Sequence, residues 1–401
     1  MRHEGILQKL TVNYQDNIHK SHITFLNAAI DSLGAGAFLT CVNLGRGFKT
    51  KTTAKHNIKR VNYMLGSKCL HRERIYFYKA IASSLIAKGS RPLILVDWSS
   101  TTPCRKFHIL RASIVVENKG RALTLYEENH PESLLTARKV HANFLKKLHE
   151  IIPDDCSPII ITDAGYRVSW FKMMLEHGWD YIGRVRGRVH YSNDSAFAAW
   201  KPCNYLYKEA SQRAKYIGKL ALTQTNQWMC SAYIVKRKTK GRKKKRVMGK
   251  ADLSTASQKN AARESEPWLL VSSLEGKHLA KKIVNCYSKR MQIEEGFRDI
   301  KSKRYGMGLK FSRTRSAKRF DILLLIASLA HMVMYLLGRS ADQAGIVRSL
   351  QTNSIRCRRV LSHVFVGLQL WRMQPHRGCV QKMKEILGRL KLEVADVYPS
   401  L

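Results

Sequence analysis

Two short apolar runs that each end in an aspartate decide the expected fold: LILVD at residues 93–97 and IIITD at residues 159–163. A short apolar run bounded by turn residues is typical of a buried strand. If the two strands lie side by side and parallel, Asp97 and Asp163 meet at one edge of a sheet, where open α/β sheets usually place a site. Close carboxylates repel unless a cation joins them, and oxygen ligands favour Mg²⁺ or Mn²⁺ over zinc. Taken alone the pair is weak evidence, because most aspartates at strand ends cap the following turn.

The pattern around these two runs predicts a mixed α/β sheet. Strand-like alternation occupies residues 107–116 and 121–127, joined by a turn at Asn118-Lys119-Gly120. A helix opened by Pro131 is expected over residues 130–152. A further helix over 165–178 and a strand over 181–185 complete the order β-β-β-α-β-α-β. Residues 188–267 break this rhythm and predict an inserted β-rich subdomain, with strands at 216–223 and 227–235.

The charge of the chain points to a polyanionic partner. Among 401 residues, 71 are Lys or Arg and 29 are Asp or Glu, which gives a formal net charge of +42. Such a charge repels itself unless it is neutralised, and nucleic acid is the obvious partner. Residues 236–246 are almost all basic, which fits either a surface loop or an arm on a phosphate backbone. Residues 17–84 show a helical pattern in which basic residues lie close together, at Lys55, Lys59 and Arg60. They form either a solvated helix face or a helical module that reads DNA.

Composition also favours a cytoplasmic location. Nine scattered Cys residues without metal-binding spacing are typical of free thiols in a reducing compartment. Residues 1–14 lack the apolar block of a signal peptide. The longest apolar run, residues 322–337, is shorter than a bilayer span and predicts a buried helix.

A third group of polar residues lies on a helix expected over residues 281–302. At about 100° per residue, four side chains fall within an arc of about 60°, namely Tyr287, Arg290, Glu294 and Lys301. An arc that mixes an aromatic ring, two cations and an acid is not a core face. It could equally be a surface ladder, since Arg290 and Glu294 stand at i and i+4.

These residues carry a resemblance to a known family. The spacing Tyr-x2-Arg-x3-Glu-x6-Lys from residue 287 resembles the signature of the insertion-sequence-four family of bacterial DDE transposases, and within it the insertion-sequence-ten members. Four further segments are similar: LVDWS at 95–99, DAGY at 163–166, YSKRMQIEE at 287–295 and SRTRS at 312–316. The resemblance covers residues 26–337.

The resemblance implies a ribonuclease-H-like fold with a catalytic triad of Asp97, Asp163 and Glu294. It also implies two Mg²⁺ ions, replaceable by Mn²⁺, on those carboxylates. Glu295 does not fit the signature spacing. The implied reaction is cut-and-paste transposition through nicking, hairpin formation, hairpin opening and strand transfer. Trp268 would stack on an extruded base, while Tyr287, Arg290 and Lys301 would hold phosphates.

The implied organisation has four parts. A helical DNA-end-binding domain spans residues 1–88, and the catalytic domain spans 89–187 and 266–320. The β-rich insertion takes 188–265, and residues 321–401 form a C-terminal helical region with a possible dimerisation role. Basic residues beyond the signature, Arg313 and Arg315 among them, predict a phosphate-tracking surface. The expected partners are transposon ends and target DNA bound by a homodimer near the nucleoid, without a membrane.

Two other functions fit the residues. A ribonuclease-H-fold endonuclease or resolvase would cut DNA without strand transfer, and the triad alone does not separate it from a transposase. A non-catalytic DNA-binding protein is the third hypothesis, against which all three acids and the full signature are intact.

Overall fold

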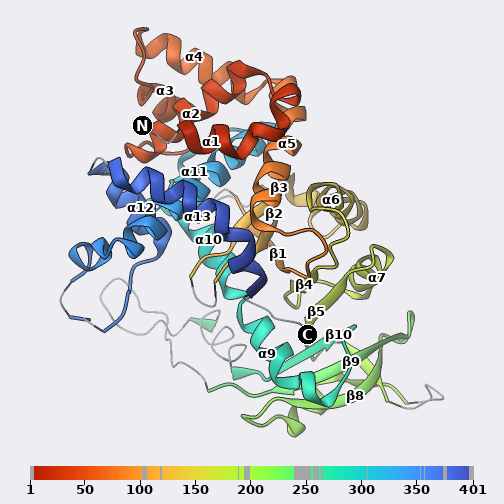
Figure 1. The fold of residues 1–401 in the computed structure, drawn as a ribbon. Coiled ribbons are helices and arrows are strands. Elements are labelled where there is room, and N and C mark those ends of the chain that lie inside the picture. The colour runs from red at the N-terminus through yellow and green to blue at the C-terminus, as the bar shows by residue number, and fades with distance from the viewer. Residues whose placement is uncertain are drawn as a thin grey trace. The chain divides into compact units, whose positions relative to one another are not determined.

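The computed structural model describes residues 4–101, 106–117, 120–187, 189–193, 199–238, 254–255, 262, 265–304, 306–352, 354–355, 357–373 and 377–396. The chain divides into two compact units, one of residues 1–158 with 291–400 and one of residues 159–290 (Figure 1). The turn at Asn118-Lys119 and most of the basic segment 236–246 lie outside the described residues. The division into four domains remains a prediction.

The first unit begins with a group of helices, as the apolar periodicity predicts. They are α1 (Glu4–Thr11), α2 (Lys20–Gly34), α3 (Cys41–Arg46), α4 (Ala54–Leu65) and α5 (Lys68–Leu85), with a 3-10 turn over Val12–Asn17. Hydroxyl side chains cap three of them. Thr40 accepts the N–H of Asn43 at 3.1 Å, Ser67 accepts that of Leu70 at 3.2 Å, and Thr53 accepts that of His56 at 3.5 Å.

Three antiparallel strands follow, β1 (Leu93–Ser100), β2 (Phe107–Ile114) and β3 (Leu123–Pro131), in the order β3-β2-β1. The helix expected over residues 130–152 is α6 (Arg138–Ile151), so its predicted start is wrong. Pro131 ends β3, where it pairs with Phe107, and does not open the helix. A 3-10 turn over Glu132–Leu134 and a positive φ of 62° at Thr136 then separate strand from helix.

The core of the first unit is a helix that is buried on all sides. It is α11 (Ala317–Gln343), packed against α2, α5, β3, α12 (His363–Arg372) and α13 (Arg377–Asp396) (Figure 1). By length and composition α11 could cross a membrane, but its apolar window is wholly buried inside the structure. One such helix is typical of the core of a soluble protein, which confirms the predicted buried helix at residues 322–337.

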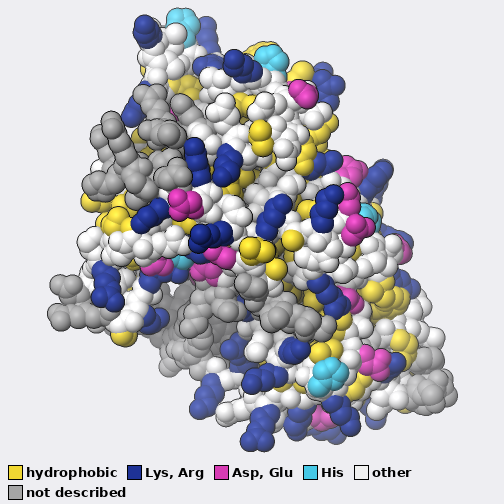
Figure 2. All heavy atoms as spheres, viewed as in Figure 1, with side chains coloured by type: hydrophobic (Ala, Val, Ile, Leu, Met, Phe, Trp, Pro, Cys, Tyr) yellow, Lys and Arg dark blue, Asp and Glu magenta, His cyan; other side chains and the backbone are white. Residues whose placement is uncertain are grey.

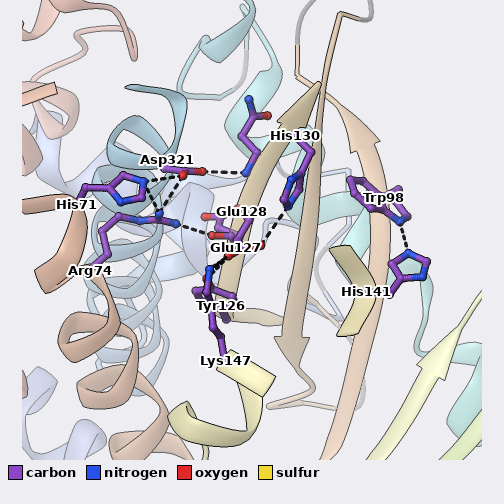
Figure 3. A network of polar contacts seen from close by, with 11 residues as sticks. His71, Arg74, Trp98, Tyr126, Glu127, Glu128, His130, His141, Lys147 and Asp321 are labelled. Carbon is purple, nitrogen blue, oxygen red and sulfur yellow. Dashed lines mark hydrogen bonds and ion pairs between the residues drawn. The ribbon is translucent and has the colours of Figure 1, made fainter. Parts of the chain in front are cut away.

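A polar network ties α11 to its neighbours. Arg74 of α5 pairs with Asp321 of α11 at 2.9 Å, and His71 contacts the same carboxylate at 3.0 Å. The other oxygen of Asp321 accepts the backbone N–H of Asn129 in β3 at 2.8 Å. Figure 3 shows Arg74 reaching both Asp321 and Glu127. The N-terminal helices are thereby joined to the sheet of the same unit.

The second unit is mostly sheet. Its strands are β4 (Ile159–Thr162), β5 (Asp180–Val185), β6 (His190–Ser192), β7 (Lys201–Pro202), β8 (Lys215–Leu222), β9 (Trp228–Val235) and β10 (Trp268–Ser272). They run in the order β4-β5-β10-β9-β8-β6-β7, with β4 and β5 parallel and the other described pairs antiparallel. The predicted strands near residues 181, 216 and 227 are confirmed. This unit also holds α7 (Val168–Glu176) and α9 (Ala280–Ser288).

Candidate active site

Asp97 lies where β1 passes from buried to half-buried residues. The four residues before it are buried, and Asp97 and the three after it are half-buried. Its Oδ1 accepts the backbone N–H of Trp98 at 2.8 Å. The Trp98 side chain points away to the next layer, where its indole N–H donates to His141 at 3.1 Å (Figure 3). Asp97 therefore lies within β1, which continues to Ser100, so the expectation that this strand ends at Asp97 is wrong.

Glu294 lies on α10 (Met291–Lys301), the helix that packs on β1 in the same unit. Its neighbour Glu295 is engaged elsewhere, in ion pairs with Arg121 at 3.3 Å and Arg298 at 3.1 Å. These pairs give Glu295 a structural role. Glu294 is half-buried on the same helix face as Lys301, seven residues later.

Lys301 is placed between the sheet and the helix. It is 8% exposed and donates to the hydroxyl of Ser99, two residues after Asp97. Burial, together with the cations of Arg111 and Lys310, lowers the pKa of Lys301 to about 7. The Asp97 carboxylate opposes this shift. The ammonium predicted to hold phosphate therefore lies inside the unit, next to the Asp97 strand.

The single helix expected over residues 281–302 is wrong, because the chain breaks it into α9 and α10. Lys289 N–H donates to Cys286 at 3.1 Å and Arg290 N–H to Tyr287 at 3.0 Å, both three residues back. Such i→i+3 bonds tighten the backbone and end the α-helical register. The arc calculated across residues 287–301 does not hold, and the boundary between the two units falls between Arg290 and Met291.

Asp163 follows β4 in the second unit. Its Oδ1 accepts the backbone N–H of Gly165 at 2.7 Å, which turns the chain toward α7. Tyr287 of α9 is buried, and burial raises its pKa. The Asp163 carboxylate adds to that rise, whereas the guanidinium groups of Arg290 and Arg184 oppose it. Within this unit the second strand-end aspartate and two signature residues therefore share one electrostatic environment.

Trp268 opens β10 beside this cluster. Its ring meets that of Tyr287 edge-on, with centroids 4.9 Å apart and planes at 75°. The guanidinium carbon of Arg237 lies 4.9 Å from the centroid of the Trp268 ring, a cation–π distance. Trp268 itself is half-buried. The half-buried indole is thus oriented by one ring and covered by one cation.

The remaining predicted contact residues are accessible basic side chains. Lys55 and Lys59 of α4 are exposed and Arg60 is half-buried, whereas Arg313 and Arg315, between α10 and α11, are both exposed. Lys and Arg side chains are spread over the face drawn in Figure 2. The structure does not contradict the expected basic surface, and its contacts with DNA remain predictions.

The three acids fit a hard divalent cation in donor type. All of their donors are carboxylate oxygens, the ligands that Mg²⁺ prefers. Asp97 and Asp163 each have one oxygen oriented by a backbone N–H. Across the described ranges, no three or more His, Cys, Asp and Glu side chains lie close enough together to hold a metal ion. The carboxylate donors are therefore present, Asp97 and Glu294 in the first unit and Asp163 in the second.

Comparison with protein families identifies the family of the chain. The model of the transposase DDE domain matches residues 88–330, more than half of the chain. The protein belongs to this family of DDE transposases, and its mixed α/β architecture is consistent with their ribonuclease-H-like fold. No curated protein matches the chain. The family implies an enzyme that acts on DNA.

Proposed function

We propose that this protein is a cut-and-paste transposase that excises a bacterial DNA element and joins it to target DNA. The family match carries the proposal, because residues 88–330 contain Asp97, Asp163 and Glu294 together. The charge of +42 supports a DNA partner. The signature from Tyr287 to Lys301 supports the insertion-sequence-four family, and hence nicking, hairpin formation, hairpin opening and strand transfer.

On this proposal Asp97, Asp163 and Glu294 are the catalytic residues and would hold two Mg²⁺ ions, or Mn²⁺ in their place. Bound metal would activate the attacking oxygen and stabilise the leaving oxygen at the phosphodiester. The chain itself contributes orientation. The backbone N–H groups of Trp98 and Gly165 each fix one carboxylate oxygen, so that the aspartates do not reorient during the reaction.

Trp268 is proposed to stack on a base extruded from the bent DNA end. Its edge-on contact with Tyr287 fixes the plane of the ring. Arg237 lies over the ring and would have to move aside, or stack on the far side of the base, when DNA binds. Arg290 and Lys301 are proposed to contact backbone phosphates nearby.

The N-terminal helices are proposed to bind the DNA ends through Lys55, Lys59 and Arg60 of α4. Hairpin chemistry on two ends is proposed to use a homodimer on DNA. The cytoplasm, near the nucleoid, is the proposed location. The C-terminal helices α12 and α13 pack on α11 within the first unit, and a dimerisation role for this region stays a proposal.

The first test is a cleavage assay with Mg²⁺ and DNA that carries the ends of the element. Wild type should give hairpin-ended fragments and joined products. Asp97→Asn, Asp163→Asn and Glu294→Gln should abolish both while retaining end binding. Cleavage without hairpins or joining would favour the endonuclease, and binding without cleavage would favour a non-catalytic protein. Loss of binding in all three variants would show that the acids are structural.

A second test addresses the phosphate-tracking surface. Arg313→Ala should weaken DNA binding regardless of sequence and reduce the salt slope of log K by about one. Arg389→Ala, which removes an exposed cation from α13 outside the matched region, is the matched control and should leave the slope unchanged. Equal slopes for wild type and Arg313→Ala would remove Arg313 from the DNA-contacting surface.

A further inference from the structure

Three charged residues lie in a row across the sheet of the first unit. Asp97 of β1 pairs directly with Arg111 of β2, and Arg111 pairs directly with Glu127 of β3. Residues opposite one another in an antiparallel pair point to the same face, with Cβ atoms about 4.5–5.5 Å apart. The row therefore places Arg111 between two residues that carry carboxylates, Asp97 and Glu127.

The two inner members of the row are fully buried. Arg111 is 1% exposed and Glu127 is 0% exposed. Two nitrogens of Arg111 donate to one Glu127 oxygen, Nε at 2.8 Å and Nη2 at 2.6 Å, and Ser328 of α11 donates to the other at 2.5 Å. Arg74 also donates to the backbone carbonyl of Glu127 at 2.7 Å (Figure 3). Glu127 is thus fixed from three directions.

Stability alone does not account for this ion pair. Removing two charges from water costs several kcal/mol each, and apolar side chains of similar volume often stabilise a core equally well or better. The pair lies in the middle of two buried strands, HILRASI (108–114) and LTLYEE (123–128), where apolar side chains could pack instead. The further contacts of Arg111 therefore indicate a function of this ion pair other than stability.

The other side of Arg111 faces α10. Its guanidinium carbon lies 4.5 Å from the ring centroid of Phe297, and its Nη1 lies 3.6 Å from where a side chain on Gly296 would begin. Phe297 is one turn after Glu294. Lys301 lies over the same ring at 4.9 Å and bonds to Ser99 of β1. Arg111 therefore lies beside the Asp97 strand and against the Glu294 helix at once.

We propose that Arg111, held in place by Glu127, is a positioning residue that sets the distance between the Asp97 strand and the helix bearing Glu294. The inference rests on the proposed catalytic role of these two acids. The guanidinium of Arg111 suits this task because it is rigid and planar and is held by Glu127. It can therefore fill the space between β1 and the Phe297 ring in a single orientation. Supporting groups of this kind hold metal-binding side chains in register.

The deciding variant removes both charges, Arg111→Met with Glu127→Leu, so that no buried charge is left unpaired. Its urea midpoint and its affinity for DNA ends should equal or exceed those of wild type. Its nicking rate should fall about a hundredfold, the cost of misplacing a reacting group by about 1 Å. Mn²⁺ binding without DNA, measured by calorimetry, should weaken by about 10- to 100-fold.

Glu128→Gln is the matched control. Glu128 is the next residue of β3, on the opposite face, where it contacts His130 and Lys147 instead of the charged row. It should leave nicking and Mn²⁺ binding unchanged. If both variants reduce nicking equally, the effect belongs to β3 in general and the positioning role is wrong.

Two outcomes separate this inference from the proposed function. If Asp97→Asn is inactive while the double variant nicks at the wild-type rate and binds Mn²⁺ normally, the Arg111–Glu127 pair is merely structural. If Asp97→Asn nicks like wild type, the proposed function itself fails. Should the double variant not fold, Arg111→Lys decides the matter, because it keeps the charge but loses the fork and the stacking on Phe297. Wild-type nicking by Arg111→Lys would then overturn the inference.

Discussion

Two glycine-to-alanine substitutions, at Gly338 of α11 and Gly388 of α13, are predicted to change stability with opposite signs, because Gly338 lies where two helix backbones touch and Gly388 does not. At Gly338 of α11, a Cβ atom would lie 1.8 Å from the backbone carbonyl oxygen of His363 in α12. Conversely, a Cβ on Gly367 of α12 would lie 1.9 Å from the carbonyl oxygen of Met334 in α11. The two helix backbones touch at both points, so that neither side can yield by rotating a side chain.

The expected magnitude follows from this geometry. To restore a separation of about 3 Å the helices must part by about 1.2 Å, which loosens a well-packed core at a cost of up to about 3 kcal/mol. Alanine regains about 1 kcal/mol of helix propensity over glycine. Gly338→Ala should therefore lower the free energy of unfolding by about 2 kcal/mol.

Gly388→Ala in α13 is the control, since among the described residues no atom lies within 4 Å of its Cβ position. It should raise stability by up to about 1 kcal/mol. Urea unfolding followed by circular dichroism measures both variants. Adding Gly367→Ala to Gly338→Ala should cost less than the sum, because the helices have already separated. A Gly338→Ala protein that is as stable as Gly388→Ala would refute the close contact.

Two further predictions concern buried charges of the first unit. Burial alone raises the pKa of Glu128, but its contacts with His130 and Lys147 lower it to about 2. A lowered carboxyl pKa stabilises the fold above about pH 4.5 and ceases to do so as the pH falls toward 2. In urea titrations at pH 7, Glu128→Gln should therefore have a free energy of unfolding about 2 to 3 kcal/mol below that of wild type. This figure is reduced for solvent screening at the half-exposed Lys147. Near pH 2 the difference from wild type should be much smaller. Asp321→Asn should cost about 3 to 5 kcal/mol in the same assay, because it leaves the buried Arg74 without its anion; a loss below about 1 kcal/mol would show that the pair does not join α5 to α11.

Local patterns predicted the strands that carry the two aspartates. A short apolar run followed by an acid needs no distant information, and β4 ends directly before Asp163 as expected, whereas β1 continues three residues past Asp97. The predictions from apolar periodicity were wrong where the backbone changes its conformation although the residue pattern does not change. The break at Lys289 and Arg290 interrupts no apolar pattern, and Pro131, which suits a helix start, is also tolerated at a strand end.

The Arg111–Glu127 pair shows what long-range packing adds. The sequence contains the signal, a charged residue within each of three neighbouring apolar strands, but spacing along the chain does not show which charges face each other. Pairing required the antiparallel register of β1, β2 and β3 and a hydroxyl from Ser328, 201 residues after Glu127. Such partners are visible only once the strands and α11 are placed.

The first unit is discontinuous in sequence, which bears on how the protein is made. Its sheet is complete by residue 131, but α11, the helix that covers β3 and supplies Ser328 and Asp321, begins only at residue 317. During synthesis the growing chain must therefore carry an uncovered face of β3, with the contact from Ser328 to Glu127 not yet formed, while the whole second unit emerges and folds. A transcript or reading frame that ends before residue 317 thus yields a chain with β1, β2 and β3 but without α11, one of the helices that pack on β3.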